Sequence, residues 1–379
     1  MNYDVIVAGL GAMGSATAFH LASRGRRVLG LDRFVPPHAL GSSHGRSRII
    51  REAYFEHPLY VPMVQRAYLN WAELERLSGR RLLVRTGGLM IGPPDGLVAG
   101  GARRSAIEHD LAYEELSSRE VRRRFPGYRP SDDMVGIWEP RAGFLIPEAA
   151  IETHLALARE RGAEVRVDEP VVAWRAMGDD VEVVTPRGRY TAGCLVLAVG
   201  AWMKQLVPEL ELPLVVERNV MHWFRPENSN DLFAPERFPV FLCEFAPGRA
   251  WYGIPDSGDG IKVALHHQGE LTDADALRRD VAPEEIARIR SLMEVFMPLV
   301  ADAECVESAA CMYTNTPDEH FVIDRHPGCP SVIIASPCSG HGFKFSSAIG
   351  EILADLATTG KSRFDLSPFR LDRFSRTSQ

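Results

Sequence analysis

Three glycines near the start of the chain have the spacing of a turn that binds the phosphates of a dinucleotide. Gly9, Gly11 and Gly14 follow the apolar run 4–8 and precede a helix-like run over 15–22. In such a unit the first two glycines let the backbone approach a pyrophosphate, and the third allows close helix–strand packing. A glycine turn without a ligand is the weaker alternative, because strand, turn and helix are all present.

An acidic residue follows the glycines at the distance that this interpretation requires. The apolar run 28–31 ends in Asp32, about twenty residues after the turn, where a carboxylate accepts hydrogen bonds from an adenosine ribose. The next stretch, 33–47, is rich in Pro, Gly, His and Ser and is predicted to be a loop beside the cofactor. These residues predict a dinucleotide site and leave open which dinucleotide it holds.

Two motifs near the other end of the chain contain further chemical groups. Residues 308–314 are predicted to form a strand with Cys311 and Tyr313 on one face and Met312 on the other. Cys311 can also be a small buried hydrophobe, the commonest role of an isolated cysteine. The glycine-rich segment 339–345 leads directly into the last predicted helix, so its backbone amides can face an anion.

Lysine is rare in this chain. Only four of its 43 basic residues are lysines, so arginine serves as the general surface cation. A lysine that remains can be needed for its compact ammonium group and its movable pKa. Lys204 and Lys361 are interpreted as surface residues. Lys262 lies on the same strand face as His266, and it is either a functional cation or an exposed side chain, while Lys344 lies in the glycine-rich segment.

The remaining pattern predicts the elements that position these groups. A chain of 379 residues suggests two or three domains. Apolar spacing and turn residues predict helices over 59–77, 118–125, 147–161, 283–296 and 345–356. They predict strands over 82–91, 164–167, 171–174, 181–185 and 194–200, and an antiparallel sheet over 214–264.

We therefore predict an α/β fold. Its first part is an FAD-binding Rossmann-like domain of the glutathione-reductase type, because a β-meander and a returning strand follow the nucleotide-binding unit. Its second part is an α+β substrate domain built on an antiparallel sheet. The FAD-binding domain is discontinuous, over 1–82, 146–215 and 305–379, and the substrate domain covers 83–145 and 216–304.

Charge and cysteine content exclude several classes of protein. The formal net charge is −7 and the pI is near 6.0, which argues against a nucleic acid or an anionic membrane as partner. Six scattered cysteines form no zinc-type cluster, so we expect no metal. No apolar run reaches transmembrane length and no room is left for a signal peptide, so we expect a cytoplasmic protein with free thiols.

Five motifs together resemble one family along nearly the whole chain. They are 9–14, Gly41-Ser42-Ser43-His44-Gly45, Arg48-Ile49-Ile50-Arg51, Cys311-Met312-Tyr313-Thr314 and 339–344. They are similar to the monomeric sarcosine oxidase and N-methyltryptophan oxidase family, within the D-amino-acid oxidase-like flavin amine oxidases. The last two motifs are specific in combination, whereas the glycine turn alone would not separate families.

The resemblance implies FAD that is covalently bound, through a thioether from Cys311 to the flavin 8α-methyl carbon. It also implies a set of residues around the cofactor: Gly9, Gly11, Ala12, Met13, Gly14, Asp32, Arg33, Ser42, Ser43, Val171, Gly200, Gly342, Phe343 and Lys344. His44 and Arg48 are placed beside the flavin, where they tune it or only support their loop. Lys262 is placed over the flavin ring as the site of oxygen activation, since a fixed ammonium stabilises the charge that forms on oxygen.

The resemblance assigns Arg51 and Lys344 to the substrate carboxylate, and Tyr252, His266, Tyr313 and Gly340 to the same pocket. A structural ion pair is the alternative for Arg51. The implied reaction oxidises an N-methyl amino acid, sarcosine first, by hydride transfer to flavin N5. Water then yields formaldehyde and the primary amino acid, and O2 reoxidises the flavin to give hydrogen peroxide. The implied protein is a monomer.

Two positions depart from the family pattern, and other functions stay open. Arg46 stands where the family usually has an acid, which leaves substrate choice uncertain, and Cys338 is either a spectator thiol or another attachment point. The alternatives are an oxidase of N-methyltryptophan or of a cyclic imino acid such as proline or pipecolate, and a flavin dehydrogenase with another electron acceptor. An NAD-dependent dehydrogenase or a nucleotide-binding regulatory protein would be colourless.

Overall fold

The first strand of the chain lies at the centre of a mostly parallel sheet. The computed structural model describes residues 2–226 and 231–376. Strand β1 (Asn2–Ala8) pairs in parallel with β2 (Val28–Leu31) and β12 (Gly188–Leu197). The sheet continues through β9 (Glu164–Arg166), β10 (Ala173–Met177), β11 (Asp180–Thr185), β19 (Val322–His326) and β20 (Cys329–Ser336). β1 is buried throughout its inner residues, as continuous apolar parallel strands are.

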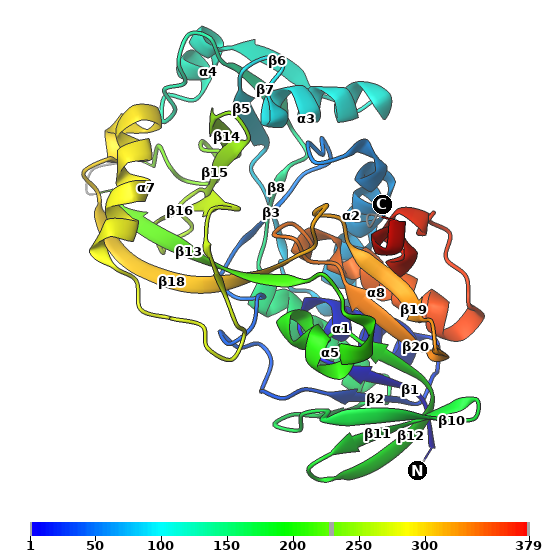
Figure 1. Ribbon diagram of the computed structural model, residues 1–379. Coiled ribbons are helices and arrows are strands. Elements are labelled where there is room, and N and C mark those ends of the chain that lie inside the picture. Colours follow the sequence, from blue (N-terminus) through cyan, green and yellow to red (C-terminus); the bar gives the residue numbers. More distant parts are fainter. Residues whose placement is uncertain (1, 227–230, 377–379) are drawn as a thin grey trace.

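Helices cover one face of this sheet (Figure 1). They are α1 (Ala12–Ser23), α5 (Pro147–Glu160) and α8 (Ser346–Thr359), and α2 (Val61–Ser78) packs against α5 and α8. α1 contacts both α5 and α8, and the three helices share one hydrophobic core with β1 and β12. The glycine turn therefore sits between a buried strand and a buried helix, and both fix its position.

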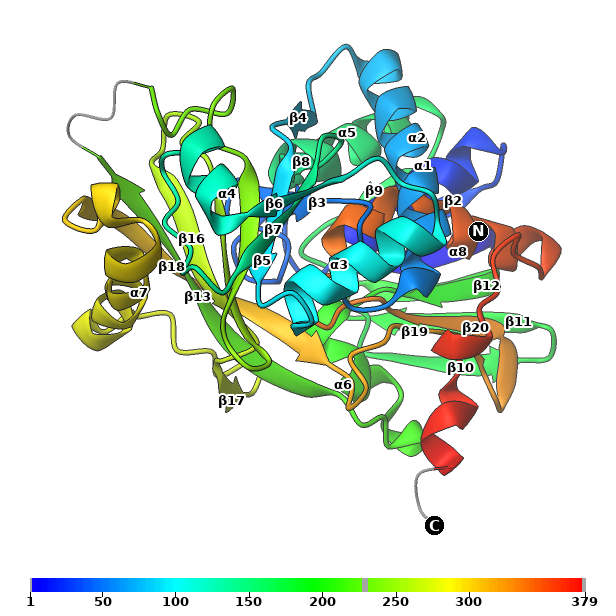
Figure 2. The same ribbon diagram turned by 90° about the horizontal axis from the view of Figure 1, so that it is seen from above.

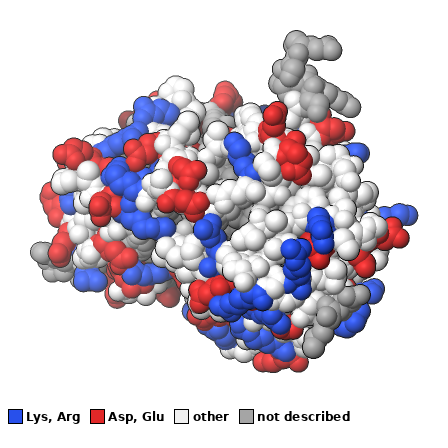
Figure 3. Space-filling view, turned by 60° about the horizontal axis from the view of Figure 1, so that its bottom comes forward, with Lys and Arg blue, Asp and Glu red and all other residues white. Residues whose placement is uncertain are grey.

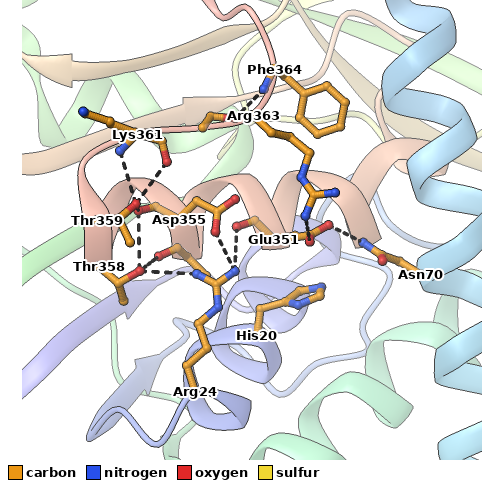
Figure 4. A network of polar contacts seen from close by, with 12 residues as sticks. His20, Arg24, Asn70, Glu351, Asp355, Thr358, Thr359, Lys361, Arg363 and Phe364 are labelled. Carbon is orange, nitrogen blue, oxygen red and sulfur yellow. Dashed lines mark hydrogen bonds and ion pairs between the residues drawn. The ribbon is translucent and has the colours of Figure 1, made fainter.

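A buried carboxylate joins three segments on this helical side (Figure 4). Glu351 of α8 accepts a bidentate hydrogen bond from Arg66 of α2, at 2.6 and 2.7 Å. It also accepts bonds from Asn70 at 3.0 Å and from Arg363 at 3.0 Å. Burial alone raises the pKa of Glu351, but these donors lower it to about 2. The network holds α8 against α2 and the C-terminal segment.

The second domain is built on a nine-stranded, largely antiparallel sheet (Figure 2). Its strand order is β17-β13-β16-β15-β14-β5-β7-β6, and β18 pairs with β13 along its other edge. The strands are β5 (Gly88–Gly92), β6 (Glu114–Ser117), β7 (Val135–Glu139), β13 (Val215–Arg225), β14 (Val240–Ala246), β15 (Arg249–Ile254), β16 (Ile261–His266), β17 (Glu270–Thr272) and β18 (Glu304–Asn315).

Helices pack on both sides of this second sheet. α4 (Ser118–Arg124) and α7 (Pro283–Phe296) share a core with one face. α3 (Leu97–Glu108), which the sequence did not predict, packs against β5 and β14. A short α6 (Met203–Leu206) and 3-10 turns at 58–60, 200–202, 208–210, 298–300, 343–345, 367–369 and 371–376 complete the helical segments. The predicted α/β architecture with a second, antiparallel sheet is confirmed.

The strand expected over 82–91 is wrong as a single element. It is two strands in different sheets: β4 (Leu83–Arg85) pairs with β8 (Gly143–Leu145), and β5 belongs to the large sheet. Between them the amides of Thr86 and Gly87 both donate to the carbonyl of Ala142, so the chain turns from one sheet into the other. β3 (Arg48–Ile50) completes the small three-stranded sheet.

The strand with Cys311 lies in the antiparallel sheet. β18 pairs with β13 along its whole length, from Val215 opposite Asn315 to Arg225 opposite Glu304. The expected domain boundary between residues 304 and 305 would separate β18 from its partner strand β13. The pairing of these two strands continues instead to Asn315. Two long hydrogen-bonded strands thus run out of the second domain toward the first (Figure 1).

Charged side chains of both signs lie on the surface (Figure 3), and the cysteines are free thiols. Basic and acidic side chains are interspersed on the face shown in Figure 3. Within 2–226 and 231–376, no helix is long and apolar enough to cross a bilayer, and the same residues contain no His, Cys, Asp and Glu cluster suited to a metal ion. All six cysteines are free thiols.

Candidate active site

One cavity of about 520 Å³ extends from the glycine turn to the face of the antiparallel sheet. It brings together residues that lie far apart in the sequence. Its walls contain the predicted cofactor residues Gly9, Gly11, Ala12, Met13, Asp32, Arg33, Ser42, Ser43, Val171, Gly200, Gly342 and Phe343. They also contain the predicted reactive and substrate residues Arg48, Arg51, Tyr252, His266, Cys311, Tyr313, Gly340 and Lys344. Gly14, His44 and Lys262 are buried outside its walls.

The glycine turn is shaped by close backbone contacts. Gly9 has φ of +84°, and a Cβ there would lie 2.5 Å from the carbonyl oxygen of Ala198. A Cβ on Gly14 would lie 1.7 Å from the carbonyl oxygen of Gly9, so Gly14 allows α1 to start directly above β1. Gly14 therefore serves helix–strand packing, while Gly9 and Gly11 line the cavity.

Asp32 closes the same end of the cavity. Its carboxylate accepts the amide of Leu10 at 2.6 Å and that of Phe34 at 2.8 Å, which fixes the turn. Burial raises the pKa of Asp32, although these two hydrogen bonds lower it. A ligand that donates a further hydrogen bond to this carboxylate would therefore be favourable. Arg33 lies 4.7 Å from the ring of Trp202, a cavity residue that sequence reasoning missed.

The other end of the cavity is the face of β13, β15, β16 and β18. Cys311 pairs in register with Asn219, and its sulfur lies 3.6 Å from Nη2 of Arg48. The same guanidinium donates to the carbonyl oxygens of Ser42 and Ser47, both at 2.9 Å. Arg48 therefore supports its loop and also places a positive charge beside the thiol.

The cavity contains polar groups that suit a large polar ligand. Among the described residues, Nδ2 of Asn219 and Oγ1 of Thr314 are buried without a hydrogen-bond partner, and both residues line the cavity. Buried polar atoms are costly unless they are paired. Together with the open glycine turn and Asp32, they fit a dinucleotide that extends from Gly9 to Cys311.

Arg51 and a residue that the sequence did not reveal form a buried ion pair. Nη2 of Arg51 lies 2.5 Å from Oε2 of Glu56, and both residues line the cavity. Burial raises the pKa of Glu56, but Arg51 and Lys344 lower it to about 2. Arg51 therefore forms an ion pair and also lines the cavity. In the sequence, Glu56 is marked only by its position five residues after Arg51.

Lys344 supplies a second buried cation. Its Nζ donates to the carbonyl oxygen of His341 at 2.9 Å and to the hydroxyl of Tyr54 at 3.3 Å. Burial and the charge of Arg51 lower the pKa of Lys344 to about 7, although Glu56 raises it. The cavity therefore contains two basic groups around one carboxylate.

Three further predicted side chains line the same cavity. The hydroxyl of Tyr313 lies 3.5 Å from Nδ1 of His266, and the rings of Tyr252 and His266 meet edge to face. Burial and neighbouring His267 keep the pKa of His266 well below its ordinary value, so the ring is neutral near pH 7.

Lys262 and His44 lie behind the loop that lines the cavity. Lys262 is 1% exposed, so the exposed alternative is wrong. Its Nζ donates to the carbonyl oxygens of Gly45 at 2.9 Å and Ser47 at 2.7 Å. Burial and the charge of Arg48 hold the pKa of Lys262 well below its ordinary value. His44 is buried, and burial lowers its pKa to about 3.

Cys338 also lies in the cavity wall. Burial raises the pKa of its thiol to about 11, although a hydrogen bond from Ser336 opposes this. A thiol that stays protonated is a poor nucleophile. This favours the spectator alternative for Cys338.

Comparisons with known proteins identify relatives of this chain. A family model described as FAD dependent oxidoreductase matches residues 4–356. Monomeric sarcosine oxidase of Streptomyces avermitilis is 46% identical over 372 residues, which are 97% of each chain. Monomeric sarcosine oxidase of a Bacillus species is 40% identical over 98% of this chain and 97% of its own. N-methyl-L-tryptophan oxidase of Salmonella typhimurium is 37% identical over 99% of this chain and 100% of its own.

Solved structures agree with this relationship. NikD, described as an unusual amino acid oxidase essential for nikkomycin biosynthesis, superposes with a TM-score of 0.83 at 25% identity, over 97% of both chains. L-proline dehydrogenase from P. horikoshii shares the fold, with a TM-score of 0.85 at 20% identity over 99% of this chain and 98% of its own. The expected FAD cofactor and flavin amine oxidase activity are therefore confirmed. The chain belongs to the FAD dependent oxidoreductase family, alongside monomeric sarcosine oxidases and N-methyl-L-tryptophan oxidases.

Proposed function

We propose that this protein oxidises a small N-methyl amino acid, sarcosine first, with O2 as electron acceptor. One observation carries the proposal: the buried cations Arg51 and Lys344 lie in the same cavity as Cys311. The named activities of the relatives at 37–46% identity point to the same substrate class. The products are glycine, formaldehyde and hydrogen peroxide.

FAD would be held between the glycine turn and Cys311. Gly9, Gly11 and the start of α1 would bind its phosphates, and Asp32 would bind its ribose. Bound there, FAD supplies two-electron oxidation of the substrate and reaction with O2. Cys311, next to Arg48, is proposed to be its covalent attachment point, because a neighbouring cation stabilises the thiolate that must react.

The substrate carboxylate is proposed to bind Arg51 and Lys344. Because Arg51 is already paired with Glu56, the incoming carboxylate competes with a resident one. Nη2 of Arg51 contacts Glu56, whereas its Nε has no partner among the described residues, so a small substrate with one carboxylate can bind at Nε while Glu56 keeps its contact. Neutral His266 can accept a hydrogen bond from the substrate amine, and Tyr252 and Tyr313 exclude water from the methyl group.

Lys262 is proposed to act in the reaction with oxygen. A buried amine held by two carbonyl oxygens is preorganised, so it does not reorganise when negative charge develops on oxygen nearby. Lys262→Met should slow the reaction of the reduced enzyme with O2 far more than anaerobic reduction by substrate. Equal effects on the two half-reactions would remove the oxygen role.

A substrate screen tests the proposal. Purified protein is mixed in air with sarcosine, N-methyl-L-tryptophan, L-proline and pipecolate, and hydrogen peroxide and formaldehyde are measured. We expect peroxide and formaldehyde in equal amounts with sarcosine. If only a cyclic imino acid gives peroxide, and no formaldehyde forms, the substrate is a cyclic imino acid and not an N-methyl amino acid. Reduction of the flavin by substrate with negligible peroxide would indicate a flavin dehydrogenase instead.

The flavin linkage, the oligomeric state and the location are tested separately. After denaturation, yellow colour and fluorescence should remain with the polypeptide of the unmodified chain and be lost in Cys311→Ala, while Cys338→Ala keeps them. If the colour stays with the denatured Cys311→Ala polypeptide, the flavin is attached to another residue. We further propose a monomer in the cytoplasm, which size-exclusion chromatography and cell fractionation check.

A further inference from the structure

The carbonyl oxygens that hold Lys262 come from a strained three-residue turn. The amide of Ser47 donates to the carbonyl oxygen of Gly45 at 2.7 Å, and the central residue, Arg46, has φ of +64°. A long side chain rarely adopts this conformation, and such strain persists only where surrounding contacts impose it. The turn makes the carbonyls of Gly45 and Ser47 converge on one point, where Nζ of Lys262 lies.

Glu148 fixes this turn from the first turn of α5. Its Oε1 accepts the amide of Gly45 at 2.8 Å and the amide of Arg46 at 3.1 Å. One carboxylate oxygen therefore binds two consecutive amides, and the carbonyls of the turn are left to face Lys262. Nothing in the sequence marked Glu148 except its place after Pro147 at a helix start.

The side chain of Arg46 holds the turn from the opposite side. Its guanidinium lies 2.5 Å from Oε2 of Glu307 on β18, and 5.1 Å from the ring centre of Trp223. Nζ of Lys262 lies 5.6 Å from the same ring. Trp223 and Lys262 are register partners on β13 and β16. Arg46 thus closes over the indole that borders Lys262, at the position where the family usually has an acid.

We propose that Glu148 and the Arg46–Glu307 pair are positioning residues that hold the Gly45–Ser47 turn in its strained form, so that its two carbonyls fix the amine of Lys262. Glu148 fixes the backbone amides of the turn, and the ion pair fixes the side chain of Arg46 on the side of the turn that faces solvent. The charged or titratable groups around Lys262 are Arg46, Arg48, Glu148, Cys311 and His44. The effect on oxygen reactivity rests on the proposed role of Lys262, whereas the positioning does not.

The low lysine content allows a direct measurement. With 13C at the lysine ε carbon, the flavin-loaded protein gives at most four lysine signals by NMR, and Lys262→Met identifies the one that reports on this site. Two substitutions at Glu148 separate position from charge. Glu148→Gln keeps an acceptor oxygen and removes the charge, whereas Glu148→Ala removes both.

We expect Glu148→Ala to shift the Lys262 signal, and Glu148→Gln to leave it near its original position. With Glu148→Ala the reaction with O2 should slow about tenfold, because small displacements of a reacting group cost rate steeply. Glu307→Gln, at a half-exposed surface site that tolerates substitution, should shift the signal in the same direction by less. Glu152→Gln on the same helix and Glu304→Gln on the same strand are matched controls and should change neither readout.

An unchanged Lys262 signal in Glu148→Ala overturns the inference, and so do equal shifts in the Ala and Gln variants, which would indicate charge alone. If Glu148→Ala does not fold, Glu307→Gln decides, and an unshifted signal there overturns the role of the ion pair. A shifted signal with an unchanged oxygen rate supports the positioning and removes the proposed oxygen role of Lys262. The two proposals therefore fail separately.

Discussion

Two glutamates of this protein pair with arginine in different surroundings. Glu351 is enclosed by fixed donors from two segments, α2 and the C-terminal segment, and no cavity reaches it among the described pockets. Glu56 pairs with Arg51 in the wall of the cavity, and Nε of Arg51 has no partner within the described residues. The pKa of each carboxyl is lowered to about 2. A shifted pKa thus does not separate a structural carboxylate from one in an active site; access and incomplete pairing do.

The largest expected effect is at the accessible pair. Arg51→Ala should weaken binding of a carboxylate ligand such as acetate, and raise KM for sarcosine, by about a hundredfold, since removing one partner of a buried charge pair costs 2 kcal/mol or more. Titration of the flavin spectrum measures the first effect and steady-state kinetics the second. Arg51→Lys should recover part of the affinity. An unchanged KM in both variants would mean that Arg51, like Arg66, has only a structural role and does not bind the substrate.

At the enclosed site the loss should appear in stability instead. Glu351→Ala should lower the free energy of unfolding by about 2 kcal/mol, because Arg66 and Asn70 lose a shared acceptor. Its contribution is complete above the ordinary pKa of 4.5 and is lost as the pH falls toward the folded value of about 2. Denaturant unfolding at pH 7 and pH 3 measures this. A changed KM would contradict the comparison.

Glu56→Gln should have the opposite sign from Arg51→Ala. Removing the resident charge frees Arg51 for the substrate, so carboxylate ligands should bind about tenfold more tightly, or about 1.4 kcal/mol. Calorimetric titration with acetate provides the check, and Glu351→Gln is the matched control with unchanged affinity. Weaker binding in Glu56→Gln would show that Glu56 orients Arg51 and does not compete with substrate.

The smallest effect is a pH dependence. The pKa of Lys344 is about 7, and only its protonated form attracts a carboxylate. Affinity should therefore fall as pH rises through 7, by about fivefold, since Arg51 still contributes and one such contact is worth about 1 kcal/mol. Lys344→Arg stays charged and should flatten the profile between pH 6 and pH 8. A profile that is already flat would mean that Lys344 does not contact the carboxylate.

The sequence predicted elements well where periodicity is local. The helix over 283–296 has the predicted bounds, and the helix of Glu351 starts one residue from its predicted start. The prediction failed at 82–91, because it joined the apolar residues on both sides of Thr86 and Gly87 into one strand, whereas the chain changes sheets at these two residues. The expected domain boundary between residues 304 and 305 separates β18 from its partner β13, since strand partners far apart in sequence leave no periodic signal.

Site residues with a motif were easier to predict than their partners. Arg51, Lys344 and Cys311 stand in recognisable segments, and the fold brings them to one cavity. Glu56 and Glu148 act through contacts with residues on other elements, and a lone glutamate on a loop or at a helix start is usually a solvated side chain. Only the packed structure reveals which glutamates face a buried cation or a strained turn.

The pairing of Val215 with Asn315 has a consequence for how such a protein can change. Everything between these two residues leaves the cofactor domain and returns to it at adjacent positions, as the two strands of a hairpin do. Chain inserted between two neighbouring points adds little closure entropy to its host, however long it becomes. The loops of the segment that carries Lys262 and His266 can therefore be lengthened or trimmed over evolution while the nucleotide-binding sheet folds around an unchanged pair of ends.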